Sequence, residues 1–165
     1  MQTRGIAFVI GFVGSLSVGT QAIAQSSNEI VGSWGFVLNE TTNSDGSKIN
    51  TYGANPKGII MFDNSGHFSL FIANPDRPKF ASGNRMQGTS EEYKAAVQGS
   101  ISYFGRYSVD ESAKAINFEL EASSFPNWDG VTQKRPFSIS GDELRFTNSS
   151  GSSGGAVLVV MKRLK

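Results

Sequence analysis

The sequence predicts an all-β fold, an eight-stranded up-and-down antiparallel barrel, and two observations support this prediction. The first is a series of eight strand-length runs rich in apolar and β-branched residues. These runs cover residues 30–40, 57–63, 67–73, 100–109, 115–122, 130–139, 143–148 and 155–164. The second is that their connections are alternately long and short. Consecutive connections of an up-and-down sheet lie at opposite ends, so this pattern predicts a cup with a closed floor and an open mouth.

The short connections have the residues that hairpin turns require. Asp63-Asn64-Ser65-Gly66 joins the second and third strands, residues 110–112 join the fourth and fifth, and residues 140–142 join the sixth and seventh. Gly, Asn, Asp and Ser support the backbone conformations of such turns. The long connections, through residues 41–56, 74–99, 123–129 and 149–154, then lie together at the mouth. Mouths of β-barrels are where small molecules enter.

Residues 1–24 are predicted to be a signal peptide. Arg4 precedes an uncharged apolar stretch over residues 6–18, and Ala22-Ile23-Ala24 has the pattern that signal peptidase cleaves. The alternatives are a buried N-terminal strand or helix, or a retained membrane anchor, although the stretch is shorter than the ~20 residues of a transmembrane helix. We therefore expect export to the periplasm or secretion, with one domain over residues 25–165.

Charge and cysteine content exclude several classes of protein. The chain has 15 basic and 14 acidic side chains, and loss of Arg4 leaves 14 of each, so the mature domain has no bias toward nucleic acid or anionic membrane. The absence of cysteine excludes disulfides, thiolate catalysis and cysteine-bound metals. No spacing of metal-binding or catalytic residues is present, and we expect no cofactor and no metal.

Strands four and five show the clearest separation of inner and outer faces. In the fifth, Phe118 belongs to an apolar series that alternates with Asn117, Glu119 and Glu121. In the fourth, the same alternation directs Tyr103 and Tyr107 inward. Each buried tyrosine needs a partner for its hydroxyl. These tyrosines are either polar contacts for a ligand in an apolar lumen or core residues whose hydroxyls bond to backbone.

The sixth strand predicts an arginine inside the barrel. If Phe137 faces inward, the two-residue period directs Gln133 and Arg135 inward as well. Burying an unpaired charge costs several kcal/mol, so Arg135 needs an internal carboxylate, a rim carbonyl or the anionic group of a ligand. Pro136 leaves a second interpretation open, because a bulge there would turn Arg135 outward.

Two of the mouth loops differ from plain linkers. Residues 74–80 combine two prolines with charges, including Arg77, and precede a short helix whose capping box is Thr89-Ser90-Glu91-Glu92. We interpret this helix, between strands three and four, as a plug or lid. In the second loop Phe125 and Trp128 flank Pro126-Asn127, and such aromatics either line an entrance or seal the core.

Several segments resemble the bacterial lipocalin-like domain family over residues 30–164. Gly32-Ser33-Trp34 is similar to the Gly-x-Trp signature of lipocalins, in which a cation such as Arg163 packs on the tryptophan. The longer similar segments are Tyr52-Gly53-Ala54-Asn55-Pro56-Lys57-Gly58, Asp76-Arg77-Pro78, Glu91-Glu92-Tyr93-Lys94-Ala95, Tyr103-Phe104-Gly105, Phe125-Pro126-Asn127-Trp128 and Arg135-Pro136-Phe137. The resemblance implies a calycin-type barrel. It implies no catalytic residues, so it informs the fold more than the function.

The only histidine, His67, follows the tight turn after residue 63 and should lie at the closed end. It alternates with Ser69 and Phe71 rather than with the apolar residues of its strand. No nucleophile or metal motif surrounds it. We interpret His67 as a surface or turn residue, and the alternative is a lone catalytic base that acts with a carboxylate.

These observations lead to one main hypothesis and two alternatives. The main hypothesis is an exported protein that binds a small, mainly apolar or amphipathic molecule in the barrel lumen, with a carboxylate as one option for its polar group. The expected ligand-binding residues are Arg135, Tyr103, Tyr107, Gln133, Phe118, Arg77 and Trp128. The alternatives are a cofactor-free isomerase, cyclase or hydrolase on the same barrel, and a filled barrel that acts through its surface. We expect no nucleic-acid partner and no integral membrane span after processing, and the oligomeric state is left open.

Overall fold

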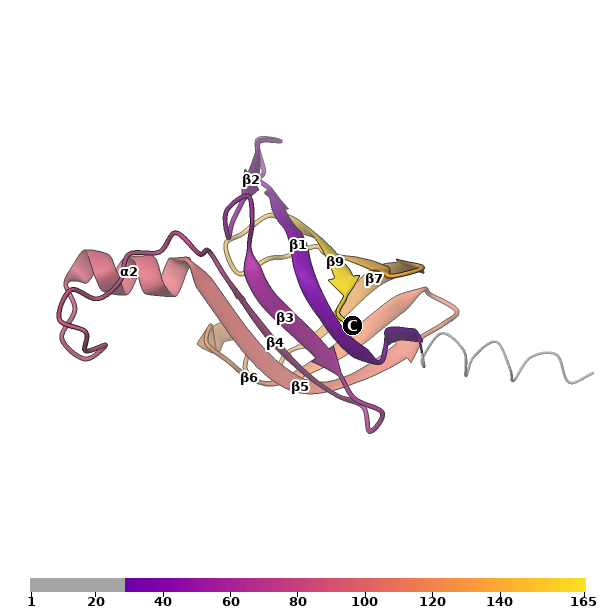
Figure 1. The fold of residues 1–165 in the computed structure, drawn as a ribbon. Helices are drawn as coiled ribbons and strands as arrows, with labels where there is room; N and C mark the ends of the chain where they lie inside the picture. Colours follow the sequence, from indigo (N-terminus) through magenta and orange to yellow (C-terminus); the bar gives the residue numbers. More distant parts are fainter. Residues whose placement is uncertain (1–28) are drawn as a thin grey trace, which may run out of the picture.

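The computed structural model describes residues 29–165, so the predicted signal peptide over residues 1–24 lies outside the described residues. Figure 1 shows the strands wrapped around a common interior. The strands are β1 (Gly32–Thr42), β2 (Lys48–Asn50), β3 (Lys57–Phe62), β4 (His67–Ala73), β5 (Ser100–Asp110), β6 (Ala115–Ser123), β7 (Thr132–Ser140), β8 (Glu143–Asn148) and β9 (Ala156–Arg163). The helix α2 (Ser90–Gln98) and the 3₁₀ turn η1 (Pro126–Trp128) lie between strands.

Pairing of the first and last long strands closes the sheet. The strand order is β2-β1-β3-β4-β5-β6-β7-β8-β9, each neighbouring pair is antiparallel, and β1 also pairs with β9. The short strand β2 pairs only with the mouth end of β1, where Thr41 is opposite Ile49. The eight long strands therefore form the predicted up-and-down barrel, and β2 is an addition that the sequence reading did not predict.

The tight turns lie at one end of the barrel and the long loops at the other, as predicted. Residues 63–66, 111–114 and 141–142 form the tight turns, and the long loops lie at the other end. The helix α2 lies in the loop between the strands over residues 67–73 and 100–110, as predicted, but it does not plug the barrel. It projects beside the mouth (Figure 1), because Tyr93 packs on Phe80 of its own loop, with ring centroids 5.7 Å apart, and no helix residue is buried.

The closed half of the barrel is filled with aromatic side chains. Phe118 is fully buried at its centre, with ring centroids 4.8 Å from Phe68 and 6.0 Å from Phe62. Beneath this cluster, Trp34 donates to the carbonyl of Ile30 at 2.8 Å, and the Arg163 guanidinium carbon lies 4.1 Å from the Trp34 ring centroid. This contact confirms the prediction that Arg163 packs on the tryptophan of the Gly-x-Trp segment. A packed floor leaves only the mouth half of the barrel available to a ligand.

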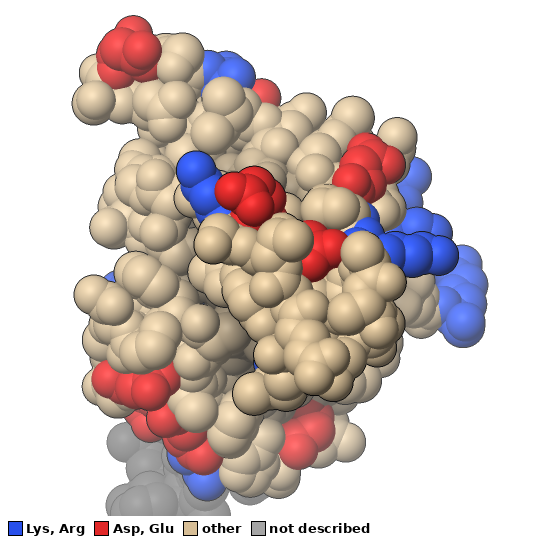
Figure 2. Space-filling view, turned by 90° about the vertical axis from the view of Figure 1, so that its left-hand side faces the viewer, with Lys and Arg blue, Asp and Glu red and all other residues tan. Residues whose placement is uncertain are grey.

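Uncharged residues cover most of the side from which the helix projects. Figure 2 shows acidic and basic side chains interspersed over this face.

Of the helices among the described residues, none is long and apolar enough to span a membrane.

Candidate functional site

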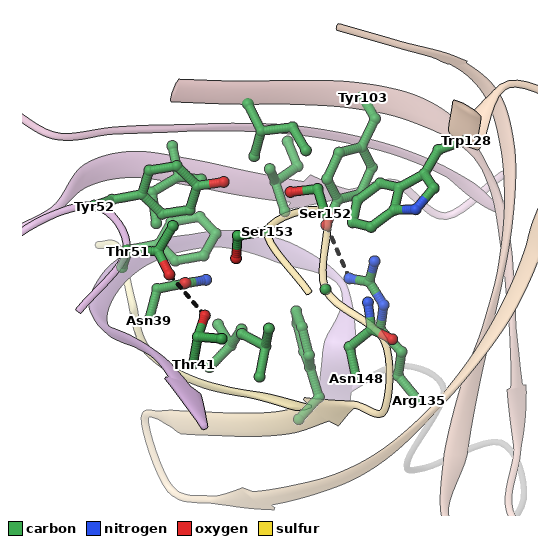
Figure 3. Close-up of a pocket in the computed structure, with 18 residues that line it drawn as sticks. Asn39, Thr41, Thr51, Tyr52, Tyr103, Trp128, Arg135, Asn148, Ser152 and Ser153 are labelled. Atoms are coloured by element: carbon green, nitrogen blue, oxygen red, sulfur yellow. Dashed lines mark hydrogen bonds between the residues drawn. The ribbon is translucent and has the colours of Figure 1, made fainter. Parts of the chain in front are cut away.

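A cavity of about 40 Å³ lies inside the mouth half of the barrel. Its apolar wall consists of Phe36, Leu70, Ile72, Ile101, Trp128, Phe146, Val157 and Val159. Its polar residues are Asn39, Thr41, Thr51, Tyr52, Tyr103, Arg135, Asn148, Ser152 and Ser153. Figure 3 shows Tyr52, Thr51, Thr41 and Asn39 at one side of the cavity, and Arg135, Asn148, Tyr103 and Trp128 at the other. An apolar enclosure with a few converging polar groups is typical of small-molecule sites.

Arg135 reaches the cavity because β7 keeps its alternation. The pairing of β6 with β7 runs without interruption through Ile116–Arg135 and Ala115–Pro136, so Pro136 does not create a bulge. The predicted inward orientation is confirmed, since Arg135 is 2% exposed and Pro136 faces outward.

The hydrogen-bond partners of Arg135 are neutral. Nη1 donates to the Tyr103 hydroxyl at 2.8 Å, while Nη2 and Nε donate to Gln133 Oε1 at 2.6 and 3.2 Å. Asn148 also donates to that Gln133 oxygen, at 3.2 Å. Nη1 and Nη2 each carry a second N–H group, for which the described residues supply no acceptor.

No carboxylate of the described residues forms an ion pair with Arg135. Aromatic rings surround the guanidinium instead, and its carbon lies 4.6 Å from the ring centroid of Phe118 and 5.2 Å from that of Phe146. Ring faces attract a cation, but less strongly than a carboxylate does at this depth. Arg135 is therefore a buried positive charge in the cavity wall that no carboxylate among residues 29–165 neutralises.

Hydroxyl groups form the opposite side of the cavity. Tyr52 is 5% exposed, and its hydroxyl points into the cavity, on the side where Ser152 lies (Figure 3). Burial raises the pKa of Tyr52 to about 12, against a smaller opposite effect of the nearby Ser152 hydroxyl. The Thr41 and Thr51 hydroxyl oxygens are 2.6 Å apart in the same wall. At neutral pH these groups are all uncharged.

A larger vestibule of about 440 Å³ lies above the cavity. Its outer walls are the end of α2, at Val97 and Gln98, and the loop at Ser124 and Phe125. The two spaces share the lining residues Thr51, Tyr52, Ile101, Ser152 and Ser153. The Ser152–Ser153 segment thus lies at the boundary between the two spaces, together with Thr51, Tyr52 and Ile101.

The structure brings five of the seven expected ligand-binding residues together. Tyr103, Trp128 and Arg135 line the cavity, Gln133 binds Arg135, and Phe118 lies directly beneath the guanidinium. The Tyr103 and Trp128 rings meet edge to face, with centroids 5.5 Å apart. Trp128 is half-buried and lines the cavity beside Tyr103.

The other two expected residues lie elsewhere. Tyr107 faces the interior near the closed end, where its hydroxyl donates to the Asp63 carbonyl at 2.8 Å. Arg77 donates from Nε to the Asn74 carbonyl at 2.9 Å and belongs to neither the cavity nor the vestibule. The alternation identified the correct face for Tyr107 but not its height in the barrel.

Five further polar residues of the cavity were not predicted from the sequence: Thr41, Thr51, Tyr52, Asn148 and Ser152. Most of them lie in loops or at strand ends, where the two-residue period carries no information. The one available signal was Tyr52, an aromatic residue in a long loop at the predicted mouth.

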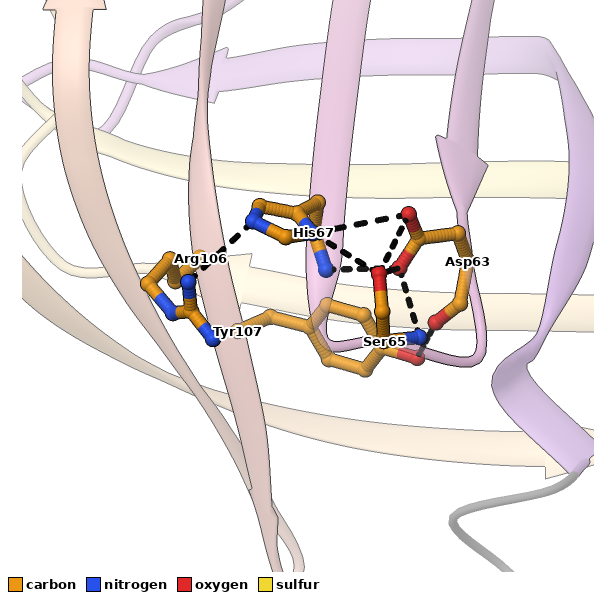
Figure 4. A network of polar contacts seen from close by, with 5 residues as sticks. All are labelled: Asp63, Ser65, His67, Arg106 and Tyr107. Carbon is orange, nitrogen blue, oxygen red and sulfur yellow. Dashed lines mark hydrogen bonds and ion pairs between the residues drawn. The ribbon is translucent and has the colours of Figure 1, made fainter.

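His67 lies at the closed end, as predicted, in a network of exposed polar groups (Figure 4). Ser65 Oγ and Asp63 Oδ2 both approach the ring nitrogen Nδ1, at 2.9 and 3.5 Å, and Nε2 lies 3.1 Å from Arg106 Nη1. A Ser-His-Asp triad has its serine and carboxylate on opposite ring nitrogens. This network instead orders the β3–β4 turn, and the backbone N–H of His67 lowers the pKa of Asp63.

Comparison with known proteins identifies a family and related proteins. A family model described as a lipocalin-like domain matches residues 31–162. The 4′-hydroxy-3′-methoxypropiophenone carrier protein of Aspergillus oryzae is 34% identical over 85 residues, which cover 48% of this chain and 77% of that protein. A crystal structure of a lipocalin-like protein from Bacteroides uniformis matches with a TM-score of 0.46 and 14% identity, over 82% of this chain and 99% of that chain.

Proposed function

The chain belongs to the lipocalin-like domain family, and on this premise we propose that it binds a small, mainly apolar molecule in the mouth half of the barrel. A carboxylate of that molecule contacts Arg135, and its apolar part lies against the aromatic and aliphatic wall. The protein then acts as a carrier or binding protein rather than as a catalyst.

The buried charge of Arg135 is the observation that carries this proposal. Removing a guanidinium from water costs several kcal/mol unless an opposite charge compensates. Arg135 is 2% exposed, bonds to neutral groups and has N–H groups directed at a cavity. A ligand carboxylate would supply the missing charge through short, charge-assisted hydrogen bonds.

The name of the Aspergillus oryzae relative supports a ligand of modest size. It denotes a carrier of a single-ring aromatic ketone. The cavity of about 40 Å³ is small for a whole molecule of that class, so the ligand extends from Arg135 into the vestibule of about 440 Å³. We therefore place a one-ring acid or ketone in this site.

Binding to matched probes tests the proposal. We expect saturable calorimetric binding of 4-hydroxy-3-methoxybenzoate, with quenching of Trp128 fluorescence, and weaker binding of 4′-hydroxy-3′-methoxypropiophenone, which lacks a carboxylate. In Arg135→Gln the affinity for the acid should fall at least tenfold, and that for the ketone by less. Arg106→Gln, a change at the closed end, is the matched control and should bind both probes as the wild type does.

Each other outcome contradicts a part of the proposal. If neither probe binds at millimolar concentration, the binding role is wrong. If Arg135→Gln binds the acid as tightly as the wild type, binding occurs without the carboxylate contact. Chemical conversion of a probe during incubation would favour an isomerase, cyclase or hydrolase over a carrier.

We also propose export, which the pattern of residues 1–24 supports. In a bacterial host, the full-length chain should yield a mature protein in the periplasm or medium whose N-terminal residue is Gln25. Intact-protein mass spectrometry of each fraction measures this. An unprocessed chain retained in the cytoplasm or membrane would contradict it.

A further inference from the structure

We infer that the site selects a ligand with two polar ends, a hydroxy-substituted aromatic carboxylic acid, whose carboxylate contacts Arg135 and whose hydroxyl group contacts Tyr52 and Ser152. This inference rests on the proposed function and extends it, because an anion at Arg135 alone does not specify the other end of the ligand.

The two polar clusters of the cavity differ in chemistry. The cluster around Arg135 offers N–H donors and a positive charge, which suit a group that only accepts hydrogen bonds. The opposite cluster consists of the hydroxyls of Tyr52, Ser152, Thr41 and Thr51. Each hydroxyl both donates and accepts, which suits a neutral hydroxyl on the ligand.

Apolar side chains make up the rest of the cavity wall. They are Phe36, Leu70, Ile72, Ile101, Phe146, Val157 and Val159. A polar group in the middle of a ligand would lose its hydrogen bonds to water there without replacement, at a cost of roughly 1–3 kcal/mol. The wall therefore favours a ring between the two polar ends.

The clusters also occupy different depths. Arg135 lines the cavity but not the vestibule, whereas Tyr52 and Ser152 line both. A molecule whose carboxylate is at Arg135 would therefore present its other end at this boundary. Tyr52 is a fixed feature of the boundary, because it is 5% exposed and stays protonated far above neutral pH.

A pair of probes that differ in one group tests the inference. In 4-hydroxybenzoate and 4-methylbenzoate the ring and carboxylate are the same, and a hydroxyl replaces a methyl group of similar size. We expect the wild type to bind the hydroxy acid roughly three- to tenfold more tightly, the value of one net hydrogen bond. In Tyr52→Phe this ratio should fall toward one. Tyr107→Phe removes a hydroxyl at the closed end and should keep the wild-type ratio.

The outcomes separate this inference from the proposed function. If both acids bind, both depend on Arg135, and the ratio is one in the wild type, the inference is wrong and the carboxylate site stands. The same holds if the ratio persists in Tyr52→Phe. If neither acid binds while Tyr52→Phe and the wild type are equally well folded by circular dichroism, the proposed function itself is wrong.

Discussion

Arg135 combines burial, positive charge and neutral partners in one residue, which is an unfavourable arrangement for stability alone. Its three donated bonds reach Tyr103 and Gln133, and neither carries a compensating charge. Removing a desolvated charge that has no opposite partner relieves the cost of burying it. We therefore interpret Arg135 as a residue kept for binding rather than for stability.

This leads to a prediction about stability. Arg135→Met should raise the free energy of unfolding by about 1 kcal/mol or more, because methionine fills the space above Phe118 without a desolvated charge. Urea unfolding measures the change. Arg163→Met is the contrasting variant and should lower stability by about 1–2 kcal/mol, since Arg163 covers Trp34 and donates to the Val31 carbonyl. A larger loss at Arg135 than at Arg163 would show that Arg135 serves mainly to stabilise the fold.

Tyr52 gives a second prediction, in alkaline solution. Its pKa in the folded protein is about 12, above the ordinary value of 10.0, so between these pH values the unfolded chain loses a proton that the folded protein keeps. Stability therefore decreases as pH rises through this window, by up to about 1.4 kcal/mol per pH unit. Compared with Tyr52→Phe, the wild type should lose more stability between pH 10 and 12. Parallel curves for the two proteins would mean that Tyr52 is not buried as described.

At the scale of elements, the register of β5 depends on one glycine. The pairing of β5 with β6 shifts between Phe104 and Gly105, and a Cβ atom on Gly105 would collide with the backbone oxygen of Glu119. The extra residue is Glu121 of β6, so β5 keeps its two-residue period and Tyr103 and Tyr107 both face inward. The predicted alternation of strand four was correct, but the sequence alone did not locate the bulge.

Gly105→Ala is therefore expected to be strongly destabilising. The added methyl group meets backbone on the neighbouring strand, which cannot give way as a flexible side chain can, so we expect a loss of roughly 3 kcal/mol. Ser108→Ala, at an exposed position of the same strand, should change stability by less than about 0.5 kcal/mol. Thermal unfolding of both variants measures the difference. Equal melting temperatures would contradict the assigned register.

The strand faces were predictable because one face of each strand must be buried, and this fixes a two-residue period in the sequence. Arg135 was found for that reason, as an exception within an otherwise clear pattern. Loop residues obey no such period. Tyr52 and Ser152 come together with Arg135 only through the closure of the barrel, and the sequence contains no local signal of that contact.

At the scale of the whole molecule, the barrel is half filled. The sequence left open whether large inward side chains would occupy the lumen, and the answer depends on height. Phe62, Phe68 and Phe118 fill the closed half, while the cavity and vestibule lie toward the mouth. The alternating long and short connections predicted which end would be open. They did not predict the vestibule. The helix was expected to plug or cover the mouth, but α2 projects beside it and leaves this space open.

The central claim is that the buried charge of Arg135 is the binding site for a ligand anion. A crystal structure of the complex with 4-hydroxybenzoate tests this most directly. We predict the carboxylate oxygens at about 2.7–2.9 Å from the Arg135 guanidinium nitrogens, with the ring against the apolar wall. A ligand found only in the vestibule, with its carboxylate in solvent and the Arg135 bonds unchanged, would contradict the claim.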